Sequence, residues 1–206
     1  MSTQYSLAVT NNSTQYLDLC LYQKPVDLGV PNALSLAWLV APAWPGTTVT
    51  FTWTEDYSFV WAETGDLKPG VTFKAQQTLP ADPDNLASNQ IQFDYRQGAF
   101  TFVQGPAAGA PQLGSLYIRE LSSIPSNTAA VGVGMSNAGT FVVSAMPNMN
   151  LVFTPHPEYW LTAGNYTGGQ LLDIEDITND VAVTFNGTFS MKAVLNAQNN
   201  WTISPA

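Results

Sequence analysis

Residues 39–52 read LVAPAWPGTTVTFT, and residues 141–154 read FVVSAMPNMNLVFT. The two stretches lie 102 positions apart, and the identical pairs are Val40/Val142, Ala43/Ala145, Pro45/Pro147, Phe51/Phe153 and Thr52/Thr154. Continuing the register without a gap pairs Asp56 with Glu158 and Tyr57 with Tyr159. The repeat predicts two tandemly related halves that arose by internal duplication.

Short runs rich in Val, Thr, Phe, Tyr and Trp, separated by Gly, Pro and Asn, continue on both sides of the repeat. They predict strands at 4–10, 16–23, 47–53, 57–62, 71–77, 90–95, 99–104, 115–120, 129–135, 139–145, 149–154, 159–163, 181–185, 188–196 and 200–204. The best short helical candidate is residues 32–38, which begins directly after a proline. The pattern therefore predicts an all-β protein of the β-sandwich or jelly-roll-like class.

A second correspondence joins residues 91–102 with residues 181–191, which both read as hairpins with one apolar face. In the first hairpin, a two-residue turn sets Tyr95 opposite Phe100. In the second, Asn186-Gly187 favours a two-residue turn, whereas matching the apolar faces needs a three-residue loop with a bulge. We favour the three-residue loop, which matches the apolar faces of the two arms.

The two halves are separated by a segment poor in regular structure. Residues 104–114 read QGPAAGAPQLG, which is typical of a connector. We therefore expect a first β half at 1–104, a connector at 105–114 and a second β half at 115–206. The halves form two domains or pack as one.

Charged residues are few, and most of them are acidic. Asp, Glu, Lys and Arg make up 10% of the residues, against about 25% in a typical soluble domain. The net charge is −9, and the basic residues stand singly: Lys24, Lys68, Lys74, Arg96, Arg119 and Lys192. Nucleic acids and anionic membrane surfaces need clustered cations, so we exclude both as partners.

The N-terminal residues Met1–Tyr5 lack the basic and apolar regions of a secretory signal. No window reaches the roughly 18 apolar residues of a membrane span. We therefore expect the chain to be cytoplasmic at synthesis, with export by a route without a cleaved signal left open.

Longer motifs resemble a known family. They are NNST at 11–14, LCLYQ at 19–23, SLAW at 35–38, PGTTVTFTW at 45–53, DYSFVW at 56–61, PGVTF at 69–73, GVGMS at 132–136, GTF at 139–141 and FTPHPEYW at 153–160. Over nearly the whole chain they resemble the family of the rhizosphere-expressed protein RhiA. The resemblance implies a bacterial protein in a quorum-sensing or host- or environment-associated setting, and it implies no reaction.

Aromatic and acidic side chains supply the candidate binding residues. Trp44 lies in an Ala-Pro-Ala-Trp-Pro-Gly turn, so it is the tryptophan we expect to be exposed and able to stack on a sugar, whereas Trp53 and Trp61 lie in strands and are expected in the core. Asp56 and Glu158 occupy equivalent places in the repeat. They would act as a glycosidase acid and base only if the halves bring them within roughly 5–10 Å.

Metal chemistry has few ligands to draw on. The chain has one cysteine, Cys20, in an apolar run that predicts a buried thiol, and one histidine, His156, so a zinc site built from several such residues is excluded. The acidic segments containing Asp82 and Asp84, and Asp173 and Asp176, offer oxygen ligands for calcium, although neither fits a calcium-binding helix–loop–helix. We expect no cofactor, with calcium as the alternative.

Three functional hypotheses follow. The first is a non-enzymatic structural or interaction protein that associates with copies of itself, because many strands and few charges leave sheet edges unguarded. The second is a carbohydrate-binding module that uses exposed aromatic residues. The third is a glycoside-directed enzyme that uses Asp56 or Glu158.

Overall fold

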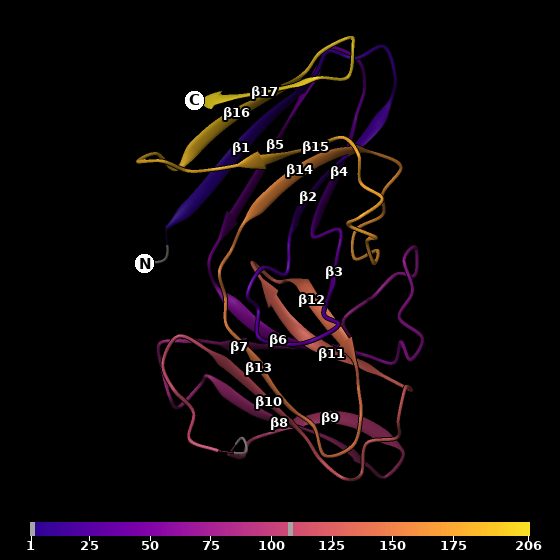
Figure 1. Ribbon diagram of the computed structural model, residues 1–206, viewed down its shortest axis with the longest axis vertical. Coiled ribbons are helices and arrows are strands. Elements are labelled where there is room, and N and C mark those ends of the chain that lie inside the picture. The colour runs from indigo at the N-terminus through magenta and orange to yellow at the C-terminus, as the bar shows by residue number, and fades with distance from the viewer. Residues whose placement is uncertain (1–2, 107–108) are drawn as a thin grey trace.

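The computed structural model describes residues 3–106 and 109–206 and is shown in Figure 1. Within these ranges the regular elements are strands arranged in four sheets, so the all-β prediction is confirmed. In the same ranges, no helix has the length and apolar character needed to cross a membrane.

Two of the sheets form the upper part of the molecule in Figure 1, which we name the upper sandwich. One sheet has the order β17-β16-β1-β5, with bounds Trp201–Pro205, Ser190–Leu195, Gln4–Asn11 and Thr47–Thr54. The other has the order β15-β14-β2-β4, with bounds Asp180–Val183, Tyr159–Gly164, Leu17–Gln23 and Leu39–Ala43. Both sheets contribute buried residues to one apolar core, including Leu7, Leu21 and Leu161.

The other two sheets form the lower sandwich. One has the order β9-β8-β10-β13, with bounds Ala99–Val103, Gln90–Arg96, Leu116–Glu120 and Asn150–Phe153. The other has the order β7-β6-β11-β12-β3, with bounds Gln77–Ala81, Tyr57–Ala62, Ala130–Met135, Ala138–Ser144 and Leu34–Ser35. Their shared core contains Phe59, Phe93 and Phe153.

The two sandwiches have the same strand order. Every strand of the upper sandwich has a counterpart at the same place in the lower sandwich. The counterparts are β14/β6, β15/β7, β16/β8, β17/β9, β1/β10, β2/β11, β4/β12 and β5/β13, and β3 is an additional strand of the lower sandwich. The pair β1–β16 is parallel in the upper sandwich, and its counterpart β10–β8 is parallel in the lower, whereas the remaining pairs are antiparallel. The strand positions agree with the repeat of 39–57 and 141–159, although the duplication itself stays a prediction.

The chain crosses between the sandwiches at a few places. The lower sandwich is built from residues 57–153 and β3, and the upper from strands that precede and follow that segment. Each of the four sheets contains strands from both sides of the predicted connector at 105–114. Residues 107 and 108 of that connector lie outside the described residues.

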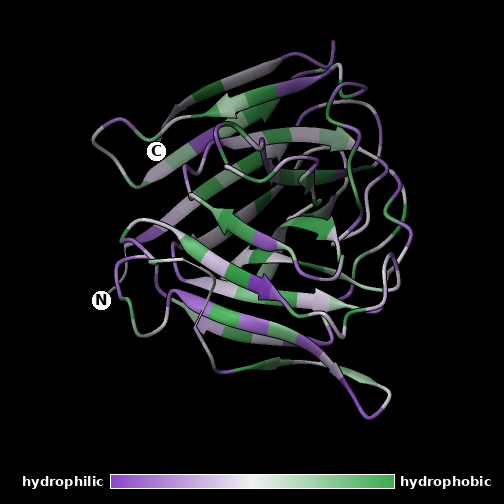
Figure 2. Ribbon diagram, turned by 60° about the horizontal axis from the view of Figure 1, so that its bottom comes forward, coloured by the Kyte–Doolittle hydropathy of each residue, from purple (hydrophilic) through white to green (hydrophobic). Residues whose placement is uncertain are grey.

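Alternation of polar and apolar residues decides which face of each strand is buried. Figure 2 shows hydrophilic residues in purple and hydrophobic residues in green alternating along the ribbons. In β5, Phe51 and Trp53 are buried while Thr50 and Thr52 are exposed. Trp53 and Trp61 are core residues, and Cys20 is fully buried, as predicted.

Three local predictions are wrong. Residues 32–38 are not helical, because Leu34–Ser35 forms β3 against β12. The strand expected at 71–77 is displaced, since β7 begins at Gln77, while Phe73 packs in a loop over the outer face of the β6–β11–β12 sheet.

The hairpin expected at 181–191 does not exist. The strand β15 pairs with β14 in one sheet, whereas β16 pairs with β1 and β17 in the facing sheet, so the chain crosses the sandwich between them. Phe185 packs against the core from this crossing. The hairpin β8–β9 forms as predicted, with Tyr95 opposite Phe100.

Candidate functional site

An exposed aromatic pair lies at one end of the upper sandwich, where Trp44-Pro45-Gly46 joins β4 to β5. Trp44 is 65% exposed and Tyr16 is 46% exposed, and their ring centroids are 4.8 Å apart. The carbonyl of Trp44 accepts hydrogen bonds from the backbone N–H of Thr47 at 3.1 Å and from its hydroxyl at 2.7 Å. The exposure predicted for Trp44 is therefore confirmed, and its role in binding stays a prediction.

Asn11, the last residue of β1, fixes the loops that carry this aromatic pair. It is fully buried, and its amide nitrogen donates to the carbonyls of Ala43 and Gln15, both at 2.9 Å. Its side-chain oxygen accepts from the backbone N–H of Ser13 at 3.0 Å and from the Ser13 hydroxyl at 2.6 Å. One amide thus holds both loops, so Trp44 and Tyr16 are presented on a rigid base.

The strand that follows Trp44 is the longest edge strand in the described part of the chain. β5 has eight residues, TTVTFTWT, without a charge, a proline or a glycine, and it stands at the end of its sheet. It pairs with β1 in continuous register from Thr47 to Thr54. Long, regular and uncharged edges are the ones that pair with another chain.

The other edge strands are shorter or interrupted. β4, β7 and β17 contain a proline, and β3, β13 and β15 have two, four and four residues. On β9 the backbone N–H of Phe102 donates to the Gln77 side chain at 3.1 Å. These features limit pairing at edges. On β5 the backbone N–H of Thr54, its last residue, donates to the Ser136 hydroxyl at 3.4 Å, and residues 47–53 have none of these features.

The structure brings Asp56, Asp82 and Asp84 to one pocket of about 650 Å³ at the junction of the sandwiches. Asp56 accepts a hydrogen bond from the Thr54 hydroxyl at 2.5 Å, and Asp82 accepts one from the backbone N–H of Asp84 at 2.9 Å. In the described ranges, no three His, Cys, Asp or Glu side chains are placed to hold a metal ion together. Calcium binding here stays an untested prediction.

Glu158 lines a different pocket from Asp56. Its pocket, of about 490 Å³, includes the aromatic residues Tyr5, Tyr159 and Phe185. Glu55 lines both pockets and accepts a hydrogen bond from the Tyr159 hydroxyl at 3.0 Å, while burial raises the pKa of that hydroxyl. Asp56 and Glu158 therefore do not share one pocket, and a glycosidase role for either stays a prediction.

Asp173 and Asp176 lie apart from the other predicted calcium ligands, in the loop after β14. Both are exposed, and they line a pocket of about 220 Å³ with Pro69 and Tyr166. The side chain of Asp173 accepts a hydrogen bond from the backbone N–H of Glu175 at 3.3 Å, as in an ordinary turn.

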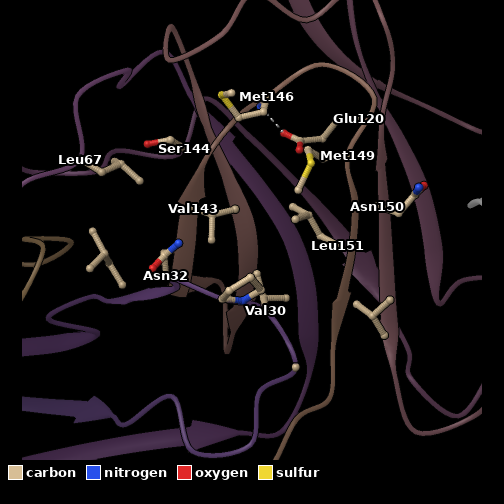
Figure 3. Close-up of a pocket in the computed structure, with 14 residues that line it drawn as sticks. Val30, Asn32, Leu67, Glu120, Val143, Ser144, Met146, Met149, Asn150 and Leu151 are labelled. Carbon is tan, nitrogen blue, oxygen red and sulfur yellow. Dashed lines mark hydrogen bonds between the residues drawn. The ribbon is translucent and has the colours of Figure 1, made fainter.

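A cavity of about 560 Å³ in the lower sandwich was not predicted from the sequence (Figure 3). Most of its lining is apolar, and Glu120, the last residue of β10, is the one titratable side chain among the described residues that line it. Glu120 is 1% exposed, and burial raises its pKa to about 7. The available signal was the alternation in β10, which puts Glu120 on the same buried face as Leu116 and Ile118.

Sequence comparison places the chain among known proteins. The RhiA family model matches residues 2–206. A protein of Rhizobium leguminosarum bv. viciae named Protein RhiA is 38% identical over 208 aligned positions, covering 99% of this chain and 87% of that protein. No solved structure matches. The chain belongs to the RhiA family.

Proposed function

We propose that this protein is a non-catalytic interaction protein that associates with copies of itself by pairing at the edge of β5. The observation that carries the proposal is β5 itself, an eight-residue neutral strand at the end of its sheet. Among the described residues no strand pairs with its other side. Family membership supports a quorum-sensing or host- or environment-associated setting for this association.

The simplest assembly is a two-fold dimer in which two copies of β5 pair antiparallel. A two-fold interface uses the same surface on both copies, so one open edge is sufficient. Backbone hydrogen bonds would continue the sheet across the dimer. With the two-fold axis at Thr50, the exposed Thr50 would face its own copy and Thr48 would face Thr52 of the other copy, and Thr–Thr pairs are favourable cross-strand neighbours.

The test is sedimentation velocity of the purified protein over a wide concentration range, with Thr50→Lys as the variant. Wild type is expected to move from monomer to a larger species as concentration rises. In Thr50→Lys two ammonium groups face each other across the two-fold axis, so the dissociation constant is expected to rise at least about tenfold.

Thr202→Lys is the matched control, because Thr202 is an exposed threonine on β17, the opposite edge strand of the same sheet. It adds the same charge and is expected to associate like wild type. A wild type that stays monomeric at all concentrations overturns the proposal, and so does equal weakening by both substitutions.

A second candidate function is glycan binding at Trp44 and Tyr16. The observation that favours it is an exposed tryptophan on a rigid base, since an aromatic face can stack on a sugar ring. On a glycan array, Trp44→Ala is expected to abolish binding while Thr50→Lys and the exposed-residue control Leu113→Ala retain it. Absence of binding to any glycan removes this candidate.

A further inference from the structure

Asn11 and Glu120 occupy the same position in the two sandwiches. Asn11 ends β1 and pairs with Leu195 of β16 and Thr47 of β5. Glu120 ends β10 and pairs with Phe93 of β8, and its backbone N–H donates to the carbonyl of Met149, just before β13, at 2.9 Å. Because β10, β8 and β13 are the counterparts of β1, β16 and β5, the two positions are directly comparable.

The two side chains differ in how many partners they have. Asn11 makes four hydrogen bonds and leaves no side-chain atom without a partner. Glu120 accepts one, from the backbone N–H of Met146 to Oε1 at 3.2 Å, and its buried Oε2 has no partner among the described residues. A carboxylate oxygen buried without a partner is costly, so its presence points to a group that binds there.

The turn beside Asn11 also differs from the turn beside Glu120. Trp44-Pro45-Gly46 in the upper sandwich corresponds to Met146-Pro147-Asn148 in the lower, and the third residue of each has a positive φ, of 78° and 62°. Met146 and Met149 are 39% and 43% exposed and line the cavity. Methionine side chains are flexible, so these two can move aside to admit a ligand to Glu120.

Among the described residues, Glu120 forms no ion pair. The ion pairs found among the described residues join Lys24 to Asp180, Lys68 to Asp66 and Arg96 to Asp94. None of the described residues that line the cavity is basic, and its volume of about 560 Å³ falls in the range of small-molecule sites. A ligand that supplies the missing cation removes the cost of burying the carboxylate.

We propose that the cavity beside Glu120 binds a small lipophilic amine, whose ammonium group pairs with the Glu120 carboxylate. The apolar chain or ring of the amine packs against Val143 and Leu151, which lie below Glu120 in Figure 3. The site is independent of the β5 edge, so the two proposals succeed or fail separately.

The test is an NMR titration of the whole protein with n-hexylamine and, in parallel, with 1-hexanol, which has the same chain without the charge. At pH 8 the amine is expected to bind at least tenfold more tightly than the alcohol, with shifts at residues that line the cavity. The amine stays protonated between pH 6 and 8, whereas Glu120 has a pKa of about 7. Affinity for the amine is therefore expected to fall about tenfold from pH 8 to pH 6.

Glu120→Gln keeps the shape of the side chain and removes its charge. It is expected to lower amine affinity to that of hexanol while hexanol binding is unchanged, which shows that the cavity is intact. Glu175→Gln, at an exposed glutamate away from the cavity, is expected to bind like wild type. Equal binding of amine and alcohol by wild type, shifts confined to other parts of the chain, or no binding of either probe overturns the proposal.

Discussion

At the scale of single residues, two buried polar side chains at equivalent strand ends have opposite roles. Asn11 closes a network that ties two loops to β1, whereas Glu120 leaves an oxygen without a partner beside a cavity. The first contributes to stability, and the second lowers it at neutral pH in the absence of a ligand.

Substituting Asn11 with Ala removes four hydrogen bonds and leaves the buried Ala43 carbonyl without its side-chain donor. The free energy of unfolding is expected to fall by about 2 to 4 kcal/mol, measured by urea denaturation. Asn12→Ala, at the exposed neighbouring asparagine, is the control and should change stability by less than about 0.5 kcal/mol. Equal effects at the two positions would contradict the role of Asn11.

Glu120 should make stability depend on pH. Its pKa is raised by burial from 4.5 to about 7, so the folded state binds the proton more tightly than the unfolded state. The resulting stabilisation is complete below pH 4.5 and is lost as the pH rises through 7. Relative to Glu120→Gln, wild type is expected to lose about 2 to 3 kcal/mol between pH 5 and pH 8 in urea denaturation. Parallel pH profiles for the two proteins would show that Glu120 titrates normally.

Some of these residues can be predicted from local sequence patterns, and others cannot, for a physical reason. The exposure of Trp44 and the burial of Trp53 follow from turn residues and strand alternation, which are local. Glu55 lines two pockets, and the Oε2 atom of Glu120 lacks a hydrogen-bond partner among the described residues. Both features depend on segments that are far away in the chain. No local pattern contains that information.

At the scale of elements, β11 and β12 lie closer together than a side chain would allow. A Cβ added at Gly132 of β11 would lie 2.0 Å from the carbonyl oxygen of Phe141 on β12. At Gly168, in an open loop, an added Cβ meets nothing within 4 Å.

Gly132→Ala is therefore expected to cost about 3 kcal/mol or more in the free energy of unfolding, because the backbone of a central strand must shift. Gly168→Ala should stay within about 0.5 kcal/mol of wild type. Thermal denaturation followed by circular dichroism measures both. A Gly132→Ala protein as stable as wild type would refute the close packing of these strands.

Most strands could be predicted from alternation and turn residues, but their partners could not. The β8–β9 hairpin is predictable because its two strands adjoin in sequence and pair across a short turn. Residues 181–191 have a similar pattern, yet β15 and β16 belong to facing sheets. An apolar face does not specify which sheet will cover it, so hairpin and crossover look alike in sequence.

At the scale of the whole molecule, the upper sandwich is closed by strands from opposite ends of the chain. The parallel pair β1–β16 joins Ser6–Asn11 to Ser190–Leu195, and the lower sandwich is made almost entirely from the segment between them. Such a distant pairing has no signal in a single sequence, although the Leu39–Tyr57 repeat reflects the strand order that the sandwiches share.

This arrangement predicts which fragments fold. A fragment of residues 55–154 contains eight of the nine strands of the lower sandwich, whereas a fragment of residues 1–104 contains only part of every sheet. The first is expected to give the dispersed amide spectrum of a folded β protein, with reduced stability because β3 is missing. The second is expected to be unfolded in the same NMR measurement. A folded 1–104 fragment would contradict the pairing of the strands.

We propose β5 as an interface between copies of this protein. Amide hydrogen exchange of the wild-type protein at low and high concentration tests it most directly, because pairing protects backbone N–H groups of the edge that forms it. Protection is expected to rise with concentration in residues 47–54 and to stay constant in residues 201–205, on the opposite edge of the same sheet. Exchange in residues 47–54 that is the same at every concentration would contradict it.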